Sequence, residues 1–197
     1  MAPTALLFDL DGTVWDSFPW YAGLLARASG GKSAALHSEL CRGASIVTLA
    51  RQRGISNGRF VAECEASLRT LRLYPGTLAT LEALASRGTP TAAVTSLPGW
   101  IAQPLLCGLQ LGPLFRWVVD ASNCASRKPR PGPVLAALQR LRIAPDHNVF
   151  YVGDRNDDAA AAKAAGVRFA WASYGYGDGC PTPSAVRLSS IDEVLGL

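Results

Sequence analysis

Two aspartates near the start of the chain, Asp9 and Asp11, are the residues best suited by type and spacing to chemistry. They follow an apolar run, and carboxylates two residues apart point the same way if the chain stays extended. Gly12 then lets the chain turn sharply. Such close, unpaired carboxylates raise one pKa or need a cation between them, and Mg²⁺ suits their oxygens. The alternative interpretation is an aspartate-rich turn without chemistry.

A second acidic group comprises Asp154, Asp157 and Asp158. It lies between an apolar run and a helical pattern, where aspartate often caps the helix. We expect one of the three acids to do so. Three acids in five residues are more than a cap needs, so the group is also a candidate metal or catalytic site.

Weaker candidates are Thr95, Ser96 and Lys128. Thr95 and Ser96 follow another apolar run, and their hydroxyls suit a phosphoryl oxygen, although such residues end many strands. Lys128 lies in a proline-containing loop, where a lysine is more often solvated. Each signal is modest taken alone.

Short apolar runs, most of them followed by a polar residue, predict the strands that must position these side chains. The runs are 5–8, 91–94, 117–119, 148–152 and 167–171, and the helical patterns are 76–87, 131–142 and 157–165. This alternation predicts an α/β fold with a doubly wound parallel sheet, in which ligands bind beyond the carboxyl ends of the strands. Because Asp9, Thr95 and Asp154 each follow a strand, we expect their side chains to converge.

Residues 14–74 interrupt the alternation, because they contain no strand-like run. Their pattern predicts three helices, 18–29, 34–53 and 58–72. The sequence therefore predicts a core domain made of residues 1–13 and 75–197, with residues 14–74 inserted as a small helical domain. A helical insertion beside a strand-end site is well placed to act as a lid.

The order of the motifs resembles that of the haloacid dehalogenase-like superfamily. The motifs are Asp-Leu-Asp-Gly-Thr at 9–13, the strand-end Thr95, Lys-Pro-Arg-Pro at 128–131 and Gly-Asp with a later aspartate at 153–158. The resemblance covers nearly the whole chain. Residues 153–177 are especially similar to the phosphoglycolate phosphatase branch, and the helical insertion corresponds to the family's first type of cap, a small one.

The resemblance implies a Mg²⁺-dependent phosphatase acting on a small phosphorylated substrate. Asp9 would form an aspartyl-phosphate, and Asp11 would serve as acid and then base. Thr95, Ser96 and Lys128 would bind phosphoryl oxygens.

The same resemblance implies that Asp9, the backbone carbonyl of Asp11, and Asp154 bind the metal. Asp158 would support the metal shell or orient Lys128, with Asp157 left as a surface acid. Ser96 departs mildly from the asparagine common after the threonine, which affects substrate positioning more than chemistry.

The inserted segment supplies candidates for substrate specificity. Trp15, Trp20 and Tyr21 could line the entrance, although aromatic residues at such spacing are more often packed core. Arg42 resembles the family's specificity loop and could meet an anionic leaving group, although a solvated arginine is at least as common. A segment of this length is short for the branch, which argues against a large substrate pocket.

The charge, the apolar stretches and the cysteines of the chain limit the kinds of partner and the cellular location that we expect. The net charge of +4 is spread along the chain, and its one cluster, 127–130, is interrupted by proline, so we expect no nucleic-acid partner. With no signal-peptide pattern and no apolar stretch near about 20 residues, we expect a cytoplasmic protein without a membrane partner, as a monomer or homodimer. Five cysteines without a paired motif predict free thiols, and the two histidines, His37 and His147, lie near no other motif.

Alternative functions remain within the same superfamily. A dehalogenase needs neither Asp11 nor a metal, so the presence of Asp11 counts against it. A phosphonate hydrolase uses a lysine of the cap, and Lys32 is the only lysine there, but that group lacks the second acid that Asp11 provides. A phosphomutase shares both Asp9 and Asp11, so the motifs do not separate it from a phosphatase. A non-catalytic phosphate-binding regulatory domain is the alternative of a different class.

Overall fold

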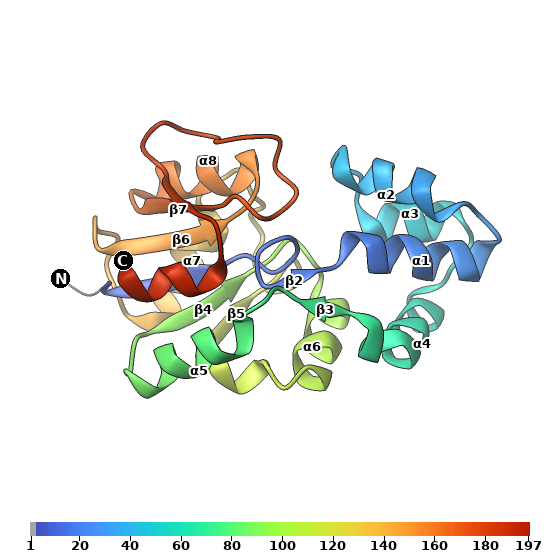
Figure 1. Cartoon of the computed structure of the whole chain (residues 1–197), viewed down its shortest axis with the longest axis horizontal. Coiled ribbons are helices and arrows are strands. Elements are labelled where there is room, and N and C mark those ends of the chain that lie inside the picture. Colours follow the sequence, from blue (N-terminus) through green and yellow to red (C-terminus); the bar gives the residue numbers. More distant parts are fainter. Residues whose placement is uncertain (1–2) are drawn as a thin grey trace.

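A six-stranded parallel sheet forms the centre of the protein, which is described here by a computed structural model of residues 3–197 (Figure 1). The strand order is β5-β4-β1-β6-β7-β8. The strands are β1 (Ala5–Phe8), β4 (Thr91–Val94), β5 (Trp117–Val119), β6 (Val149–Gly153), β7 (Arg168–Ala172) and β8 (Val186–Leu188). The predicted α/β fold with a parallel sheet is therefore confirmed.

Helices cover both faces of this sheet, because successive residues of a buried strand point to opposite sides. In β1, Leu6 and Phe8 pack in one hydrophobic cluster, whereas Ala5 and Leu7 pack in the other. The first cluster includes helices α5 (Thr77–Ser86) and α6 (Gly99–Gly108) and the C-terminal 3₁₀ helix Ile191–Gly196, and the second includes α7 (Gly132–Leu141) and α8 (Asn156–Ala165).

The sheet changes direction of winding next to β1. The chain passes from β1 to β4 and β5 on one side and then returns to β6 on the other. In open α/β sheets such a switch point leaves a crevice at the carboxyl ends of the strands, where ligands bind. The carboxyl ends of β4, β1 and β6 therefore lie side by side.

The residues between β1 and α5 form a separate group of helices beyond the ends of the strands (Figure 1). They are α1 (Phe18–Ser29), α2 (Ser33–Cys41), α3 (Ile46–Gln52), α4 (Asn57–Ser67) and the short 3₁₀ helix Leu68–Thr70. The chain enters and leaves this group through a two-stranded antiparallel ribbon of β2 (Trp15–Asp16) and β3 (Arg72–Leu73).

Two predictions for this segment are wrong. The expectation of no strand fails because β2 and β3 have two residues each, too few for a periodic pattern. The single helix predicted at 34–53 is two helices, because Gly43 turns the chain with φ +95°. Ser45 then starts α3 by accepting a hydrogen bond on its side chain from the Thr48 backbone N–H, 3.5 Å away.

Elements outside this segment were missed as well. Helix α6 contains Pro104, which weakens a helical signal, and β8 is a short edge strand. The C-terminal 3₁₀ helix packs against α5 and was also missed. None of the helices within residues 3–197 combines the length and the apolarity needed to cross a bilayer.

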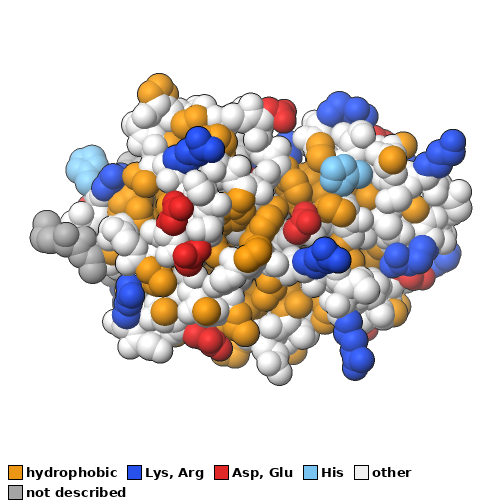
Figure 2. Space-filling model, in the orientation of Figure 1, with side chains coloured by type: hydrophobic (Ala, Val, Ile, Leu, Met, Phe, Trp, Pro, Cys, Tyr) orange, Lys and Arg blue, Asp and Glu red, His pale blue; other side chains and the backbone are white. Residues whose placement is uncertain are grey.

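Lysine and arginine side chains lie as separated spots on the face of the molecule drawn in Figure 2. Acidic side chains lie between several of them, and apolar side chains cover much of the boundary between the sheet and the helices α1–α4. This face therefore carries no continuous basic stripe.

Candidate active site

Three of the predicted site residues meet at the carboxyl ends of neighbouring strands. Asp9 follows β1, Thr95 follows β4 and Asp154 follows β6, and all three side chains are buried. The parallel ladder continues one residue past the strands, because the Asp9 N–H donates to the Val152 carbonyl over 2.8 Å. The sheet thus fixes the backbone from which these side chains project.

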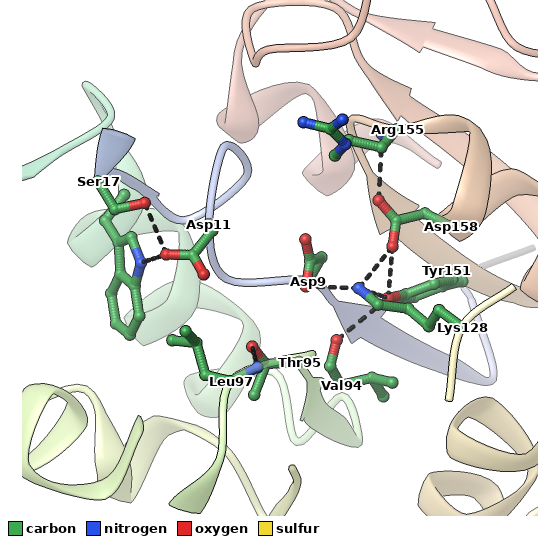
Figure 3. A network of polar contacts seen from close by, with 11 residues as sticks. Asp9, Asp11, Ser17, Val94, Thr95, Leu97, Lys128, Tyr151, Arg155 and Asp158 are labelled. Atoms are coloured by element: carbon green, nitrogen blue, oxygen red, sulfur yellow. Dashed lines mark hydrogen bonds and ion pairs between the residues drawn. The ribbon is translucent and has the colours of Figure 1, made fainter. Parts of the chain in front are cut away.

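Lys128 enters this group from the loop between β5 and α7 (Figure 3). Its Nζ lies 2.8 Å from Asp9 Oδ1 and 2.7 Å from Asp158 Oδ1. Burial by itself lowers the pKa of Lys128, but the carboxylates of Asp158 and Asp9 outweigh it and raise that pKa well above its ordinary value. A buried, charged ammonium therefore stands between two carboxylates.

Tyr151, in the middle of β6, completes the surroundings of Lys128. Its hydroxyl accepts a hydrogen bond from Lys128 Nζ over 3.1 Å and lies 3.1 Å from the Val94 carbonyl oxygen and 3.0 Å from Asp158 Oδ1. Sequence reasoning missed this residue because it counted Tyr151 only as part of an apolar strand. The available signal was a phenol within an otherwise apolar strand that ends at the acidic motif.

Asp158 has two structural tasks. One oxygen pairs with Lys128, and the other accepts a hydrogen bond from the Arg155 backbone N–H at the start of α8, over 3.1 Å. Asp158 is 1% exposed, whereas Asp157 is exposed at the protein surface. Of these two acids, Asp158 is the one that reaches the buried group.

Asp154 is the acid with an unused oxygen. Its Oδ2 accepts a hydrogen bond from the Tyr176 N–H over 2.8 Å, while its buried Oδ1 has no hydrogen-bond partner within residues 3–197. Burial, with help from the Asp158 charge, raises the pKa of Asp154 to about 7. Burial also raises the pKa of Asp9 well above its ordinary value, against the opposing effect of Lys128.

These carboxylates form a group that fits a divalent cation. Asp9, Asp154 and Asp158 each offer an oxygen, and these oxygens all lie within 4.8 Å of one another. Buried oxygen ligands that repel one another, one of them lacking a hydrogen bond, are the donor set that a hard cation such as Mg²⁺ satisfies. The carboxylate of Asp11 is not part of this group.

Asp11 instead faces the cavity beside Asp9. Its Oδ1 accepts hydrogen bonds from Ser17 Oγ, over 2.6 Å, and from Trp15 Nε1, over 2.8 Å. Burial raises the pKa of Asp11, although both hydrogen bonds oppose the shift by stabilising the carboxylate. A carboxyl group with a raised pKa retains its proton to higher pH, as a general acid must.

The hydroxyl of Thr95 is turned toward its own loop, where it accepts a hydrogen bond from the Leu97 N–H over 3.1 Å (Figure 3). Ser96 is exposed and lines the cavity. The turn that Thr95 stabilises holds Ser96 and Leu97 at the cavity wall.

A cavity of about 230 Å³ lies between the strand ends and the helical segment. Its lining residues come from both parts of the chain: Asp9, Asp11, Phe18, Tyr21, Leu40, Gly43, Ala44, Ser45, Ile46, Ser96, Leu97, Lys128, Arg155, Asp157 and Asp158. The volume is below the roughly 300–1,000 Å³ of cavities for drug-sized ligands, so it suits a compact molecule.

Three of the candidates for the entrance or for substrate specificity, Trp15, Trp20 and Arg42, are not on the cavity wall. Trp15 is fully buried, because it belongs to the ribbon that joins the two parts, and its indole N–H contacts Asp11 from behind. Arg42 follows the last turn of α2 and is exposed outside the cavity. Tyr21 does line the cavity, whereas the indole of Trp20 donates to the Ser67 carbonyl.

At the strand ends of this parallel α/β sheet, buried carboxylates surround a lysine, an arrangement suited to an enzyme of the phosphoryl-transfer class. Residues 6–172 match the model of the haloacid dehalogenase-like hydrolases, and the chain belongs to that family. Phosphoglycolate phosphatase 1 of Pseudomonas aeruginosa is 32% identical over 214 residues, which cover 99% of this chain and 78% of that protein.

Solved structures share the whole fold. A protein of Thermotoga maritima assigned as a β-phosphoglucomutase superposes with a TM-score of 0.79 at 26% identity, covering 100% of this chain and 97% of its own. A HAD phosphatase of Thermococcus onnurineus superposes with a TM-score of 0.75 at 23% identity, again covering 100% and 97%. The predictions of the family, its phosphoglycolate phosphatase-like branch and the phosphatase class are confirmed.

Proposed function

We propose that this chain hydrolyses a small phosphomonoester through an aspartyl-phosphate on Asp9. The observation that carries the proposal is the position of Lys128 Nζ, 2.8 Å from Asp9 Oδ1, with Asp11 on the wall of the same cavity. A nucleophile, a cation for the phosphoryl oxygens and a separate acid are the groups that phosphoryl transfer requires. The phosphatase relatives support the same activity.

In the first step, a carboxylate oxygen of Asp9 attacks phosphorus in line, and the bond from phosphorus to the substrate oxygen breaks. Asp11 gives its proton to the departing oxygen, so that an alcohol leaves. Lys128 Nζ holds an oxygen of the transferred group, where negative charge develops.

In the second step, Asp11, now a carboxylate, takes a proton from water. The resulting hydroxide attacks phosphorus, and the bond between phosphorus and the Asp9 oxygen breaks. The Asp9 carboxylate is regenerated and inorganic phosphate leaves. Ser17 and Trp15 keep Asp11 oriented through both steps, because both donate to the same oxygen, Oδ1.

We assign Mg²⁺ as the cofactor, held by Asp9 and Asp154, with Asp158 beside them and the Asp11 backbone carbonyl as a further ligand. Support comes from the three clustered carboxylates and from the unpaired Oδ1 of Asp154. The ion, when bound, supplies positive charge that offsets the repulsion between Asp9 and the substrate phosphate.

We assign residues 14–74 the role of a cap over this site. The segment contributes Phe18, Tyr21, Leu40 and Ile46 to the cavity wall, and apolar side chains there exclude water from the reacting groups. The ribbon of β2 and β3 is the connection about which it would move.

A phosphomutase is the second candidate, favoured by the similarity to the Thermotoga maritima protein. A mutase transfers the phosphoryl group back to a sugar, whereas a phosphatase transfers it to water. Release of inorganic phosphate in excess over any rearranged product therefore supports the phosphatase.

A panel of phosphomonoesters, including p-nitrophenyl phosphate, tests the proposal by release of inorganic phosphate with Mg²⁺ and with a chelator. We expect turnover that the chelator stops, and a loss of at least about 10³-fold in Asp9→Asn. The matched control is Asp146→Asn, in an exposed turn just before β6, at the end of that strand opposite to the site. Retained turnover in Asp9→Asn would overturn the assignment of the nucleophile.

A further inference from the structure

Arg155 spans the boundary between the sheet and the helical segment. It directly follows Asp154, at the start of α8, yet its Nη2 donates to the Cys41 carbonyl at the end of α2 over 3.3 Å. Its guanidinium Cζ also lies 6.0 Å from the centre of the Phe18 ring in α1. These contacts hold a half-buried guanidinium on the wall of the cavity.

The two cations on the cavity wall differ in their partners. Lys128 is already paired with Asp9 and Asp158, at 2.8 and 2.7 Å. Arg155 has no carboxylate oxygen within 4.0 Å anywhere in the part of the chain that the structure describes, although Asp157 also lines the cavity. Arg155 is therefore the cation of this cavity without a carboxylate partner among the described residues, and its charge is available to a group of the ligand other than the phosphoryl group that Lys128 holds.

The geometry of a guanidinium suits a particular kind of group. Its planar N–H groups bind a carboxylate or a phosphate through two parallel hydrogen bonds. Within residues 3–197 the Arg155 guanidinium donates only to the Cys41 carbonyl, through Nη2, so its other N–H groups are available. Lys128 and Asp9 mark the phosphoryl end of the cavity, so Arg155 faces what the phosphate is attached to. In a cavity of about 230 Å³ the second group can be only a short distance from the first.

We propose that Arg155 is the specificity residue of this enzyme and selects compact phosphomonoesters that carry a second anionic group, a carboxylate or another phosphate. The inference rests on the proposed phosphatase function and identifies its substrate class. It also moves the expected role from Arg42, which is exposed outside the cavity, to an arginine that the sheet itself positions.

Four small phosphate esters separate the possibilities. Phosphoglycolate carries a carboxylate, and 1,3-propanediol bisphosphate carries a second phosphate. Ethyl phosphate carries a neutral ethyl group, and phosphoethanolamine carries a cationic ammonium group. We expect the wild-type kcat/KM to be highest for one of the two substrates that carry a second anionic group, and the preferred substrate shows whether that group is a carboxylate or a phosphate. Equal values for ethyl phosphate and both anionic substrates would overturn the proposal.

The variants Arg155→Gln and Arg155→Lys test the residue itself. For the preferred anionic substrate we expect Arg155→Gln to lower kcat/KM about 10- to 100-fold, mainly through KM, as for the loss of charged hydrogen bonds. For ethyl phosphate we expect less than about a threefold change, and Arg155→Lys should recover part of the loss. An equal loss for both substrates would show a structural role and overturn the proposal.

Two further variants sharpen the comparison. Arg69→Gln alters an exposed arginine of the helical segment that does not line the cavity, and it should leave both substrates unchanged. Arg42→Gln should also leave both substrates unchanged. If Arg42→Gln, and not Arg155→Gln, lowered kcat/KM for the anionic substrate alone, Arg42 would be the specificity residue and the proposal would be overturned.

Calorimetric titration of phosphoglycolate and ethyl phosphate keeps the proposal testable if no substrate turns over. Absence of turnover for every phosphomonoester, with Mg²⁺ present, would count against the phosphatase function alone. Tighter binding of phosphoglycolate than of ethyl phosphate, lost in Arg155→Gln, would still support the role of Arg155. Equal binding of the two compounds would overturn it.

Discussion

Lys128 and Asp9 are separated by 119 residues in the chain, yet Lys128 Nζ lies 2.8 Å from Asp9 Oδ1. The two side chains are only 6% and 8% exposed, and the same ammonium lies 2.7 Å from Asp158. Charges removed from water are tolerated only when they are paired, so this lysine balances two carboxylates and is part of the folded structure as well as of the site.

Replacing Lys128 by methionine should therefore affect stability as well as phosphate binding. We expect Lys128→Met to lower the free energy of unfolding by about 3–5 kcal/mol in the absence of metal, because Asp9 and Asp158 lose their buried partner. Chemical denaturation measures the change. Inhibition by inorganic phosphate should also weaken. Lys163→Met, at an exposed position of α8, is the matched control, and an equal effect there would contradict the explanation.

Ser17 should tune the acid step through Asp11. The Ser17 hydroxyl stabilises the Asp11 carboxylate, so Ser17→Ala removes an effect that lowers the pKa of Asp11. Asp11 then keeps its proton to higher pH, and the alkaline limit of kcat/KM for ethyl phosphate should move upward by about half a pH unit or more.

The pH profile of Ser17→Ala is compared with that of Ser38→Ala, which removes an exposed hydroxyl bonded within α2. For p-nitrophenyl phosphate, whose leaving group needs little protonation, we expect a smaller shift. An unchanged alkaline limit for ethyl phosphate in Ser17→Ala would argue against Asp11 as the general acid.

Gly175 leaves room for the acid that we assign to the metal. A methyl group at this position would overlap the Gly12 carbonyl oxygen and the Asp154 side chain. We expect Gly175→Ala to displace Asp154 and weaken Mg²⁺ binding at least about tenfold, as measured by calorimetry. Gly58→Ala, in α4 with no heavy atom within 4 Å of the added carbon, should bind Mg²⁺ normally. Normal affinity in Gly175→Ala would exclude this role of the glycine.

Metal-free protein should lose stability as the pH rises from about 4 to about 7. The pKa of Asp154 is raised from 3.8 to about 7 by burial, so between these values the folded protein holds a proton that the unfolded chain has released. Stability falls with pH wherever the folded state binds more protons. With a chelator present, we expect the Tm to fall across this range, by about 3 °C or more, and saturating Mg²⁺ to reduce the fall.

Asp154→Asn isolates the contribution of this one group. Its Tm should depend less on pH over the same range, and Asp9, whose pKa burial also raises, accounts for the slope that remains. A pH dependence identical to that of the wild type would show that Asp154 is not the titrating group.

The strands and the helices that follow them were predictable because each is a local pattern. The buried run Ala5–Phe8 before Asp9 and the run before Asp154 match β1 and β6 closely, since fully buried parallel strands are continuously apolar. The elements that were missed have weak local signals. Strands β2 and β3 have two residues each, and α6 contains a proline.

The sequence by itself determined the family motifs, the parallel α/β fold and the acids at the strand ends, because all of these follow from residue type and spacing. Only the tertiary structure decided which other side chains join them. Tyr151 reaches Lys128, Trp15 supports Asp11 from behind, and Arg155, not Arg42, lies on the cavity wall. The physical reason is that such contacts depend on how separate elements pack, across up to 119 residues of chain, which no local pattern records.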